Sequence, residues 1–222
     1  MKKIFAVTSA IATLMTSQAA LANTQGSYLG MDALSTKTTF FVRQNFEATP
    51  YAIDYSPSNS HTSYGFGLNY KYALNFNDFF IAPGFILEQN GVGGSRTDGP
   101  DYQRLQVRNR YGVKADFGYD VTKTIAPYLT IGYAEVSYKT RGSGVDSGDN
   151  LVTAVNNGQS GNWFGGAGVK FDIGHNFALN LEYNYQRIKA NTTVPTQSTD
   201  YIDKTSFMTR LDIVKLGLSY NF

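Results

Sequence analysis

The last nine residues of the chain, 214–222, alternate strictly between apolar and polar side chains. Their even positions are apolar or aromatic, and their odd positions are small or polar. A period of two predicts a β-strand with one apolar face and one polar face. The sequence ends on an aromatic residue, Phe222, with no polar tail after it. Because water disfavours an apolar, fraying terminus, this pattern favours a strand whose apolar face meets lipid.

This strand resembles the terminal strand of bacterial outer-membrane β-barrel proteins. The final aromatic residue and the alternation before it carry the likeness. In that family the barrel-assembly machinery reads the apolar face of the last strand. The resemblance therefore implies these assembly-signal residues: Val214, Leu216, Leu218, Tyr220 and Phe222. It also implies the bacterial outer membrane as the location and outer-membrane lipid as a partner.

The N-terminus is typical of a secretory signal peptide. A short positive region, Met1–Lys3, precedes mostly apolar residues 4–15 and the A-x-A cleavage site Ala20–Ala22. We therefore predict a cleaved segment 1–22 and a mature domain 23–222. The net charge of +2 includes both lysines of the cleaved segment, so the mature chain is neutral. A neutral chain gives no support to nucleic-acid binding. The absence of cysteine excludes disulfides and thiolate metal sites.

Eight segments show a period of two, which predicts eight strands. Their ranges are 27–37, 64–75, 79–88, 105–119, 125–138, 163–173, 177–186 and 207–222. The connections alternate between long, loop-like stretches (38–60, 89–103, 139–161 and 190–206) and short turns near Asn77, Asp120 and His175. Outer-membrane barrels have short periplasmic turns and long extracellular loops. We therefore predict an all-β fold: an eight-stranded antiparallel up-and-down transmembrane β-barrel with three short periplasmic turns and four long extracellular loops.

The composition agrees with a barrel. The chain contains 16 tyrosines, 15 phenylalanines and 22 glycines. In a transmembrane barrel, aromatic rings collect at the two membrane interfaces and half of the strand residues face a polar interior. No run of about 18 apolar residues follows the signal segment, so no membrane-spanning helix is predicted. A soluble β-sandwich is the alternative, but the signal segment and the terminal strand favour the barrel.

The alternation assigns each strand residue to the lipid or to the lumen. In segment 105–119 it places Val107 outward and Arg108 inward. In segment 125–138 the phase slips near Glu135, so we expect a β-bulge there. Beyond this bulge Val136 and Tyr138 would face outward.

The inward positions include many charged residues. An eight-stranded barrel has a lumen just wide enough for side chains to fill it. Buried charges must be paired, because an unpaired one costs several kcal/mol. We therefore predict a network of ion pairs in the lumen, drawn from Lys71, Glu88, Arg108, Arg110, Lys114, Asp116, Lys170, Asp172, Glu182 and Lys215. The alternative is that these charges line a narrow ion path.

The first long loop is rich in aromatic residues, and exposed rings often mark a contact surface. The loop contact candidates are Phe40, Phe41, Phe46, Tyr51 and Tyr55. Alternatively these rings extend the barrel or belong to its upper aromatic girdle. Residues 146–150 carry the oxygen ligands of a calcium loop but lack its full spacing and closing glutamate, so we predict no metal site.

Signals of catalysis are weak. His61 lies beside Ser60 and Ser63, but the chain contains no G-x-S-x-G motif. A histidine among serines at a loop edge is usually a solvated residue. We therefore expect no enzyme activity and no cofactor. A lipid-modifying enzyme at the barrel rim, whose activity would depend on His61, stays an alternative.

From about residue 27 onward the chain resembles eight-stranded outer-membrane barrels of the opacity and OmpA-transmembrane-domain type. That group includes porin-like and adhesin-like surface proteins of Gram-negative bacteria. Strand number, loop alternation and the terminal strand carry the likeness. It implies a monomeric surface protein whose loops bind a host or matrix component. A narrow channel for ions or small solutes is the alternative.

Overall fold

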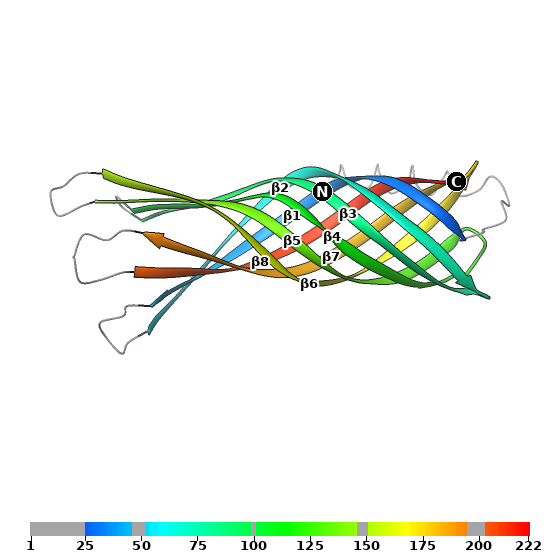
Figure 1. Ribbon diagram of the computed structural model, residues 1–222, viewed down its shortest axis with the longest axis horizontal. Coiled ribbons are helices and arrows are strands. Elements are labelled where there is room, and N and C mark those ends of the chain that lie inside the picture. Colours follow the sequence, from blue (N-terminus) through cyan, green and yellow to red (C-terminus); the bar gives the residue numbers. More distant parts are fainter. Residues whose placement is uncertain (1–24, 46–51, 99–100, 146–150, 195–202) are drawn as a thin grey trace, which may run out of the picture.

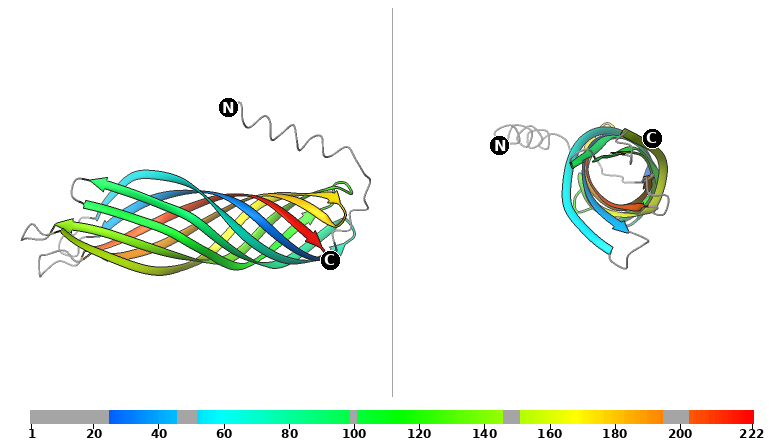
Figure 2. Two further views of the ribbon diagram at one scale, coloured as in Figure 1. Left: turned by 90° about the horizontal axis from the view of Figure 1, so that it is seen from above. Right: turned by 90° about the vertical axis from the view of Figure 1, so that its left-hand side faces the viewer.

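The sheet closes on itself into a barrel. The computed structural model describes residues 25–45, 52–98, 101–145, 151–194 and 203–222. Within these ranges the strands are β1 (Gly26–Asn45), β2 (Ala52–Phe76), β3 (Phe79–Asp98), β4 (Asp101–Tyr119), β5 (Ile125–Val145), β6 (Leu151–Gly174), β7 (Phe177–Val194) and β8 (Asp203–Asn221). Each strand pairs antiparallel with the next, and β1 pairs with β8 (Figures 1 and 2). The predicted fold class and strand number are confirmed.

The short connections lie together at one end of the barrel, on the right in Figure 1. Asn77-Asp78 joins β2 to β3, His175-Asn176 joins β6 to β7, and residues 120–124 join β4 to β5. The backbone φ of Asn77, His175 and Asn176 lies between 54° and 65°, a left-handed conformation that asparagine tolerates better than most residues. At the same end the amide of Phe222 donates to the carbonyl of Ser27 at 3.0 Å, which ties the last strand to the first.

At the opposite end the strands continue well beyond their predicted ends. β1 runs to Asn45 and β2 begins at Ala52, so most of the predicted loop 38–60 is a paired hairpin. The predicted loops 89–103, 139–161 and 190–206 also consist largely of strand, and the hairpins project separately at the left of Figure 1. The loops were predicted too long, because a hairpin outside the bilayer has no lipid-facing side that must be apolar. Its ladder satisfies the backbone without any alternation of side chains.

The exterior face is apolar only near the short-turn end. On β7 the exterior positions from Phe177 to Tyr185 are apolar or aromatic, and Arg187 is the first polar one. From Phe222 back along β8 they are apolar or aromatic as far as Val214, and Asp212 is the first polar one. Nine to eleven residues of a tilted strand cross the hydrocarbon of a membrane. The spanning part therefore lies between the short turns and these first polar positions. All five predicted assembly-signal residues lie on this lipid-facing side of β8.

The predicted bulge lies on the neighbouring strand. β5 pairs with β6 without interruption, whereas the register of β4 against β5 shifts between Val107 and Asn109. Arg108 is the extra residue and is exposed on the exterior, and Val107 turns into the lumen. Val136 and Tyr138 also face the lumen, where both are buried. The outward assignment of Val107, Val136 and Tyr138 and the inward assignment of Arg108 were therefore wrong.

The predicted signal segment 1–22 lies outside the described residues, so cleavage after Ala22 stays a prediction. None of the described residues forms a helix that is long and apolar enough to cross a membrane.

Replacement of Leu216 by arginine tests the position of the membrane. Leu216 lies on the lipid-facing side, 48% exposed. Because arginine near the bilayer midplane is expensive, we expect Leu216→Arg to lower the free energy of unfolding by about 2–4 kcal/mol. Urea titration of the protein in phospholipid vesicles measures this change.

Met208→Arg is the matched control, because Met208 lies on the same face of β8 but beyond the spanning part. We expect a change of at most about 1 kcal/mol for it. Equal losses for the two variants would contradict this placement of the membrane.

Candidate functional site

A continuous chain of ion pairs crosses the lumen. It joins seven charged side chains from five strands, none more than 7% exposed. The nitrogen–oxygen distances are Lys71–Asp116 3.1 Å, Lys114–Asp116 3.1 Å, Lys114–Glu182 2.6 Å, Lys215–Glu182 3.0 Å, Lys215–Glu88 2.7 Å and Arg110–Glu88 2.7 Å. Each of its three carboxylates bridges two cations, so no carboxylate in this series of ion pairs has only one partner.

The strand register brings two of these pairs together. Glu88 of β3 lies directly opposite Arg110 of β4, and Glu182 of β7 lies directly opposite Lys215 of β8. Side chains that face each other across an antiparallel pair are close enough to interact. The contact between Lys215 and Glu88 then crosses the lumen and connects the two halves of the barrel.

A glycine lets Lys71 reach its partner across an intervening strand. Lys71 lies on β2 and Asp116 on β4, and Gly84 of β3 lies opposite Lys71. A Cβ atom at Gly84 would come within 2.8 Å of the Cβ of Lys71. Since glycine leaves that space empty, the lysine side chain passes over β3 to the aspartate.

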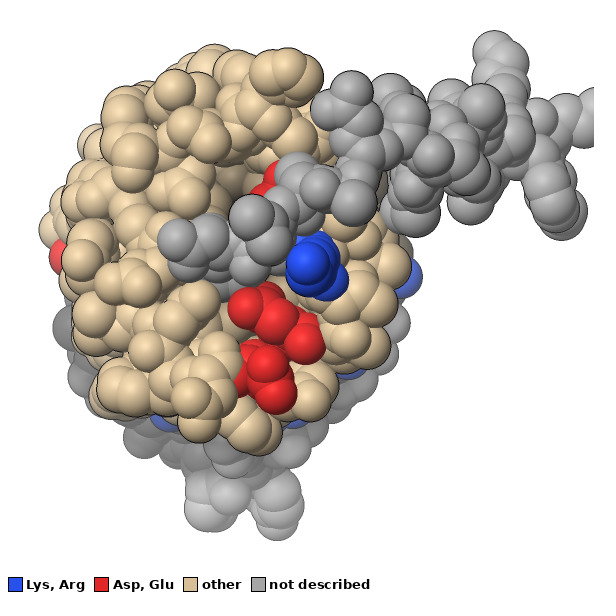
Figure 3. Space-filling model, turned by 90° about the vertical axis from the view of Figure 1, so that its right-hand side faces the viewer, with Lys and Arg blue, Asp and Glu red and all other residues tan. Residues whose placement is uncertain are grey.

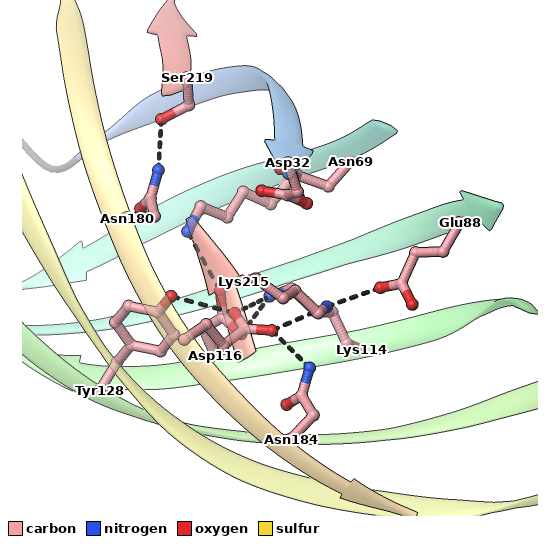
Figure 4. A network of polar contacts seen from close by, with 12 residues as sticks. Asp32, Asn69, Glu88, Lys114, Asp116, Tyr128, Asn180, Asn184, Lys215 and Ser219 are labelled. Atoms are coloured by element: carbon pink, nitrogen blue, oxygen red, sulfur yellow. Dashed lines mark hydrogen bonds and ion pairs between the residues drawn. The ribbon is translucent and has the colours of Figure 1, made fainter. Parts of the chain in front are cut away.

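Neutral side chains add hydrogen bonds to the network. The Tyr128 hydroxyl donates to Glu182 Oε2 at 3.0 Å and the Asn184 amide to Glu182 Oε1 at 2.7 Å (Figure 4). Gln186 accepts a hydrogen bond from Arg110 Nε at 2.7 Å. These groups share the low-dielectric interior with the charges, so they reduce the cost of burying them.

Asp32 belongs to the same interior but was missing from the predicted network. It is 9% exposed and accepts a hydrogen bond from the Asn69 amide at 2.8 Å. A Cβ atom at Gly217 would come within 2.2 Å of its carboxylate, so the opposite strand makes room for it. With Asp32, the buried carboxylates number four, as do the cations of the ion-pair chain.

Two apolar layers fill the lumen on the two sides of the ion pairs along the barrel axis. The outer layer lies toward the hairpins and consists of Leu34, Val107, Val136, Ile188, Leu211 and Ile213. The inner layer lies toward the short turns and consists of Tyr28, Ala73, Phe80, Ala82, Ala126 and Tyr128. No side chain of the outer layer is more than 2% exposed.

Three predicted members lie apart from the ion-pair chain. Arg108 is on the exterior, as described above. Lys170 is buried in the inner layer, with its ammonium 5.3 Å from the centre of the Tyr28 ring. Asp172 is half-buried and accepts a hydrogen bond from the Gly174 amide at 2.9 Å. Figure 3 shows the end of the barrel with the short turns, where acidic side chains gather close to basic ones.

The predicted contact candidates lie on the first hairpin or beyond the described residues. Phe40 and Phe41 are part of β1, and Tyr55 is part of β2, opposite Val42. The other two candidates, Phe46 and Tyr51, lie outside the described ranges, as does the acidic segment 146–150.

The surroundings of His61 belong to the described part of the chain. His61 is exposed on β2 opposite Thr38, and no hydrogen bond of its side chain is present among the described residues. Ser63 is buried, whereas Ser60 and His61 are exposed. The described side chains contain no group of three His, Cys, Asp or Glu residues that could hold a metal ion.

A closed antiparallel barrel with an apolar exterior and a packed, polar lumen defines a transmembrane β-barrel. Residues 6–222 match the family of the outer membrane protein beta-barrel domain. The chain belongs to this family and is a protein of the bacterial outer membrane. No curated protein sequence matches it.

Solved structures of outer-membrane proteins are similar in fold. OprG from Pseudomonas aeruginosa has a TM-score of 0.57 and 12% identity, over 89% of this chain and 96% of OprG. The outer membrane protease OmpT from Escherichia coli has a TM-score of 0.51 and 12% identity, over 94% of this chain and all of OmpT. Ail, the attachment invasion locus protein of Yersinia pestis, has a TM-score of 0.47 and 16% identity, over 89% and 99%. At such identities the likeness concerns the fold alone.

Replacement of Glu182 by glutamine tests how the network is held together. Glutamine keeps the shape of the side chain but removes the negative charge that Lys114 and Lys215 share. Since removing one partner of a buried ion pair leaves an uncompensated charge, we expect a loss of about 3–5 kcal/mol in the free energy of unfolding. Urea unfolding in phospholipid vesicles measures it.

Two further variants make this test specific. Glu135→Gln changes a half-buried exterior carboxylate and should cost at most about 1 kcal/mol. Adding Lys114→Met to Glu182→Gln removes the uncompensated cation and should restore part of the loss. Independent, additive effects of the two substitutions would contradict a coupled network.

Proposed function

We propose that the protein is a closed, monomeric surface anchor that presents four β-hairpins for binding a host or matrix component. The filled lumen is the observation that carries this proposal. The ion-pair chain occupies its middle, and the two apolar layers lie on either side. With the interior packed, the surfaces that remain for function are the hairpins and the exterior.

The hairpins suit a binding role because they are ordered beyond the membrane. β2 has 25 residues and β6 has 24, whereas about 9–11 residues span the hydrocarbon. More than half of each strand is therefore available outside it. Backbone pairing such as Val42 opposite Tyr55 preorganises the first hairpin. A preorganised surface loses less conformational entropy on binding than a flexible loop.

The outer apolar layer argues against the channel alternative. Val107, Val136, Leu211 and Ile213 have no exposed surface and meet in the lumen between the network and the hairpins. An ion on this path would lose its hydration shell, and the few buried hydroxyl groups beside this layer, such as those of Thr38 and Thr209, would replace it only in part. For the rim-enzyme alternative, the exposed His61 has neither a bonded serine nor a bonded carboxylate among the described residues.

Single-channel recording tests the closed lumen. We expect the purified wild-type monomer to show no stable conductance in planar bilayers, because the outer layer excludes hydrated ions. Leu211→Gly combined with Ile188→Gly removes two large side chains from that layer and should increase the frequency of current events. A large, steady conductance of the wild-type protein would contradict the proposal.

Trimming one hairpin tests the binding role. Thr39 and Ser60 are paired across β1 and β2, so joining them through Asn-Gly deletes residues 40–59 and supplies a two-residue hairpin turn. We expect bacteria carrying this variant to lose at least half of their binding to immobilised extracellular-matrix proteins, since all five predicted contact candidates are deleted. Surface labelling serves as the check that bacteria with the wild-type protein and with the variant display equal amounts of it.

The matched control shortens another hairpin. Joining Thr140 to Asn156, which are paired across β5 and β6, deletes residues 141–155, a segment without aromatic residues. This control should retain most of the binding. Unaltered binding after deletion of residues 40–59 would remove the first hairpin as the contact surface.

A further inference from the structure

A cluster of basic side chains lies on the exterior of β1, β7 and β8, just beyond the apolar band. It consists of Lys37, Arg187, Lys189 and Arg210 around a single carboxylate, Asp212, and we call it the cationic patch. The four basic side chains are exposed, whereas the alternating residues Thr36, Thr38, Gln186, Ile188, Thr209 and Leu211 are buried in the lumen. The patch therefore belongs to the outer wall of the barrel.

The two arginines of the patch are held close together despite their like charges. Arg187 and Arg210 lie directly opposite each other across β7 and β8, an arrangement that repulsion disfavours. Both guanidinium groups lie near the Tyr185 ring, at 5.6 Å and 5.1 Å from its centre. Arg187 also donates to the Tyr185 hydroxyl. The tyrosine ring thus gathers the two cations over one spot.

Asp212 neutralises only one of the two arginines. It accepts from Arg210 Nε and Nη2, at 2.9 Å and 3.0 Å, and from the Tyr183 hydroxyl at 2.6 Å. Among the described residues no carboxylate pairs with Arg187. Four cations against one acid leave a surplus of positive charge that an anion from outside would balance.

The patch lies at the depth of a lipid headgroup. Arg187 is the eleventh residue of β7, counted from Phe177, and Asp212 is the eleventh counted back from Phe222. Eleven tilted residues just cross the hydrocarbon. The apolar positions that precede the patch on the same faces, Leu181 and Val214 among them, lie against acyl chains. A molecule on the patch is therefore continuous with the membrane.

The opposite rim of the barrel differs in charge. Among the described side chains, the outer exterior holds seven basic residues (Lys37, Arg108, Lys139, Arg141, Arg187, Lys189 and Arg210) and two acids (Glu135 and Asp212). The short turns hold Asp78, Asp120 and Lys123. Among these described side chains the surplus of positive charge therefore lies on the hairpin side of the barrel, which we place at the outer leaflet.

We propose that the cationic patch binds the phosphate group of an anionic lipid in the outer leaflet. Arginine pairs with phosphate through two parallel hydrogen bonds, a geometry that lysine lacks. Arg187 and Arg210 bind the phosphate beside the Tyr185 ring. Lys37 and Lys189 add positive charge. The acyl chains of the lipid lie along the apolar band of the barrel. Asp212 fixes the position of Arg210. This site is independent of the hairpin contact surface.

Native mass spectrometry tests the proposal on the full barrel in neutral detergent. The probes are diphosphoryl lipid A, its dephosphorylated form, inorganic phosphate and dextran sulfate. We expect saturable binding of diphosphoryl lipid A and much weaker binding of the dephosphorylated form. The double variant Arg187→Gln with Arg210→Gln should weaken the binding of diphosphoryl lipid A roughly 30-fold, because each cation near anionic lipid contributes about a factor of five in affinity.

Arg108→Gln with Arg141→Gln is the matched control, with the same charge change on β4 and β5. It should leave lipid binding within about twofold of the wild type, since those residues lie outside the patch. Arg187→Lys with Arg210→Lys keeps the charge and should restore only part of the affinity, because bidentate contacts are lost.

Three outcomes would overturn the proposal. Equal losses for the patch variant and the β4–β5 control would mean that binding follows overall charge. Equal binding of the phosphorylated and dephosphorylated lipids would mean that the acyl chains alone are recognised. Patch-dependent binding of dextran sulfate or inorganic phosphate without the lipid would mean that the patch serves a soluble anion.

Discussion

The whole structure depends on closing the backbone ladder between β1 and β8. In the hydrocarbon there is no water to pair with a free amide or carbonyl, so an open sheet edge would cost several kcal/mol for each group. Pairing from Tyr28–Asn221 to Asn45–Lys204 removes both edges over the full length of the two strands. The apolar, ring-rich C-terminus follows from this, because the last strand must complete a wall that faces lipid.

Closure forces charge into the interior. Once one face of every strand is given to lipid, the other face must fill a narrow cylinder, and its polar residues must satisfy one another. The ion-pair network does this with side chains from strands that are not neighbours in the barrel, such as Glu88 of β3 and Lys215 of β8. Such a chain also opposes slippage, because a one-residue shift of β8 would turn Lys215 into lipid and leave Glu88 and Glu182 with fewer partners.

The alternation of side chains predicted the spanning part well and the outer part poorly, for one physical reason. Within the bilayer an apolar residue marks the exterior. Above it the exterior meets water while the lumen holds the outer apolar layer, so a large apolar residue there marks the interior. Val136 and Tyr138 follow this inverted rule, which is why they suggested a bulge that β5 does not have. The partners of Glu88 and Lys215 depend on the stagger around the whole barrel, which no local pattern contains.

The same inversion is the reason why we place the proposed functions on the outside of the barrel. An aliphatic outer layer makes a poor path for solutes but a rigid base, from which the paired hairpins extend. On the exterior, the change from apolar to basic side chains at Lys37, Arg187 and Arg210 occurs where headgroups begin. The two proposed surfaces are separable, because residues 40–59 can be removed without touching any residue of the cationic patch. Loss of matrix binding with lipid binding retained, or the reverse, would therefore assign each role to its own surface.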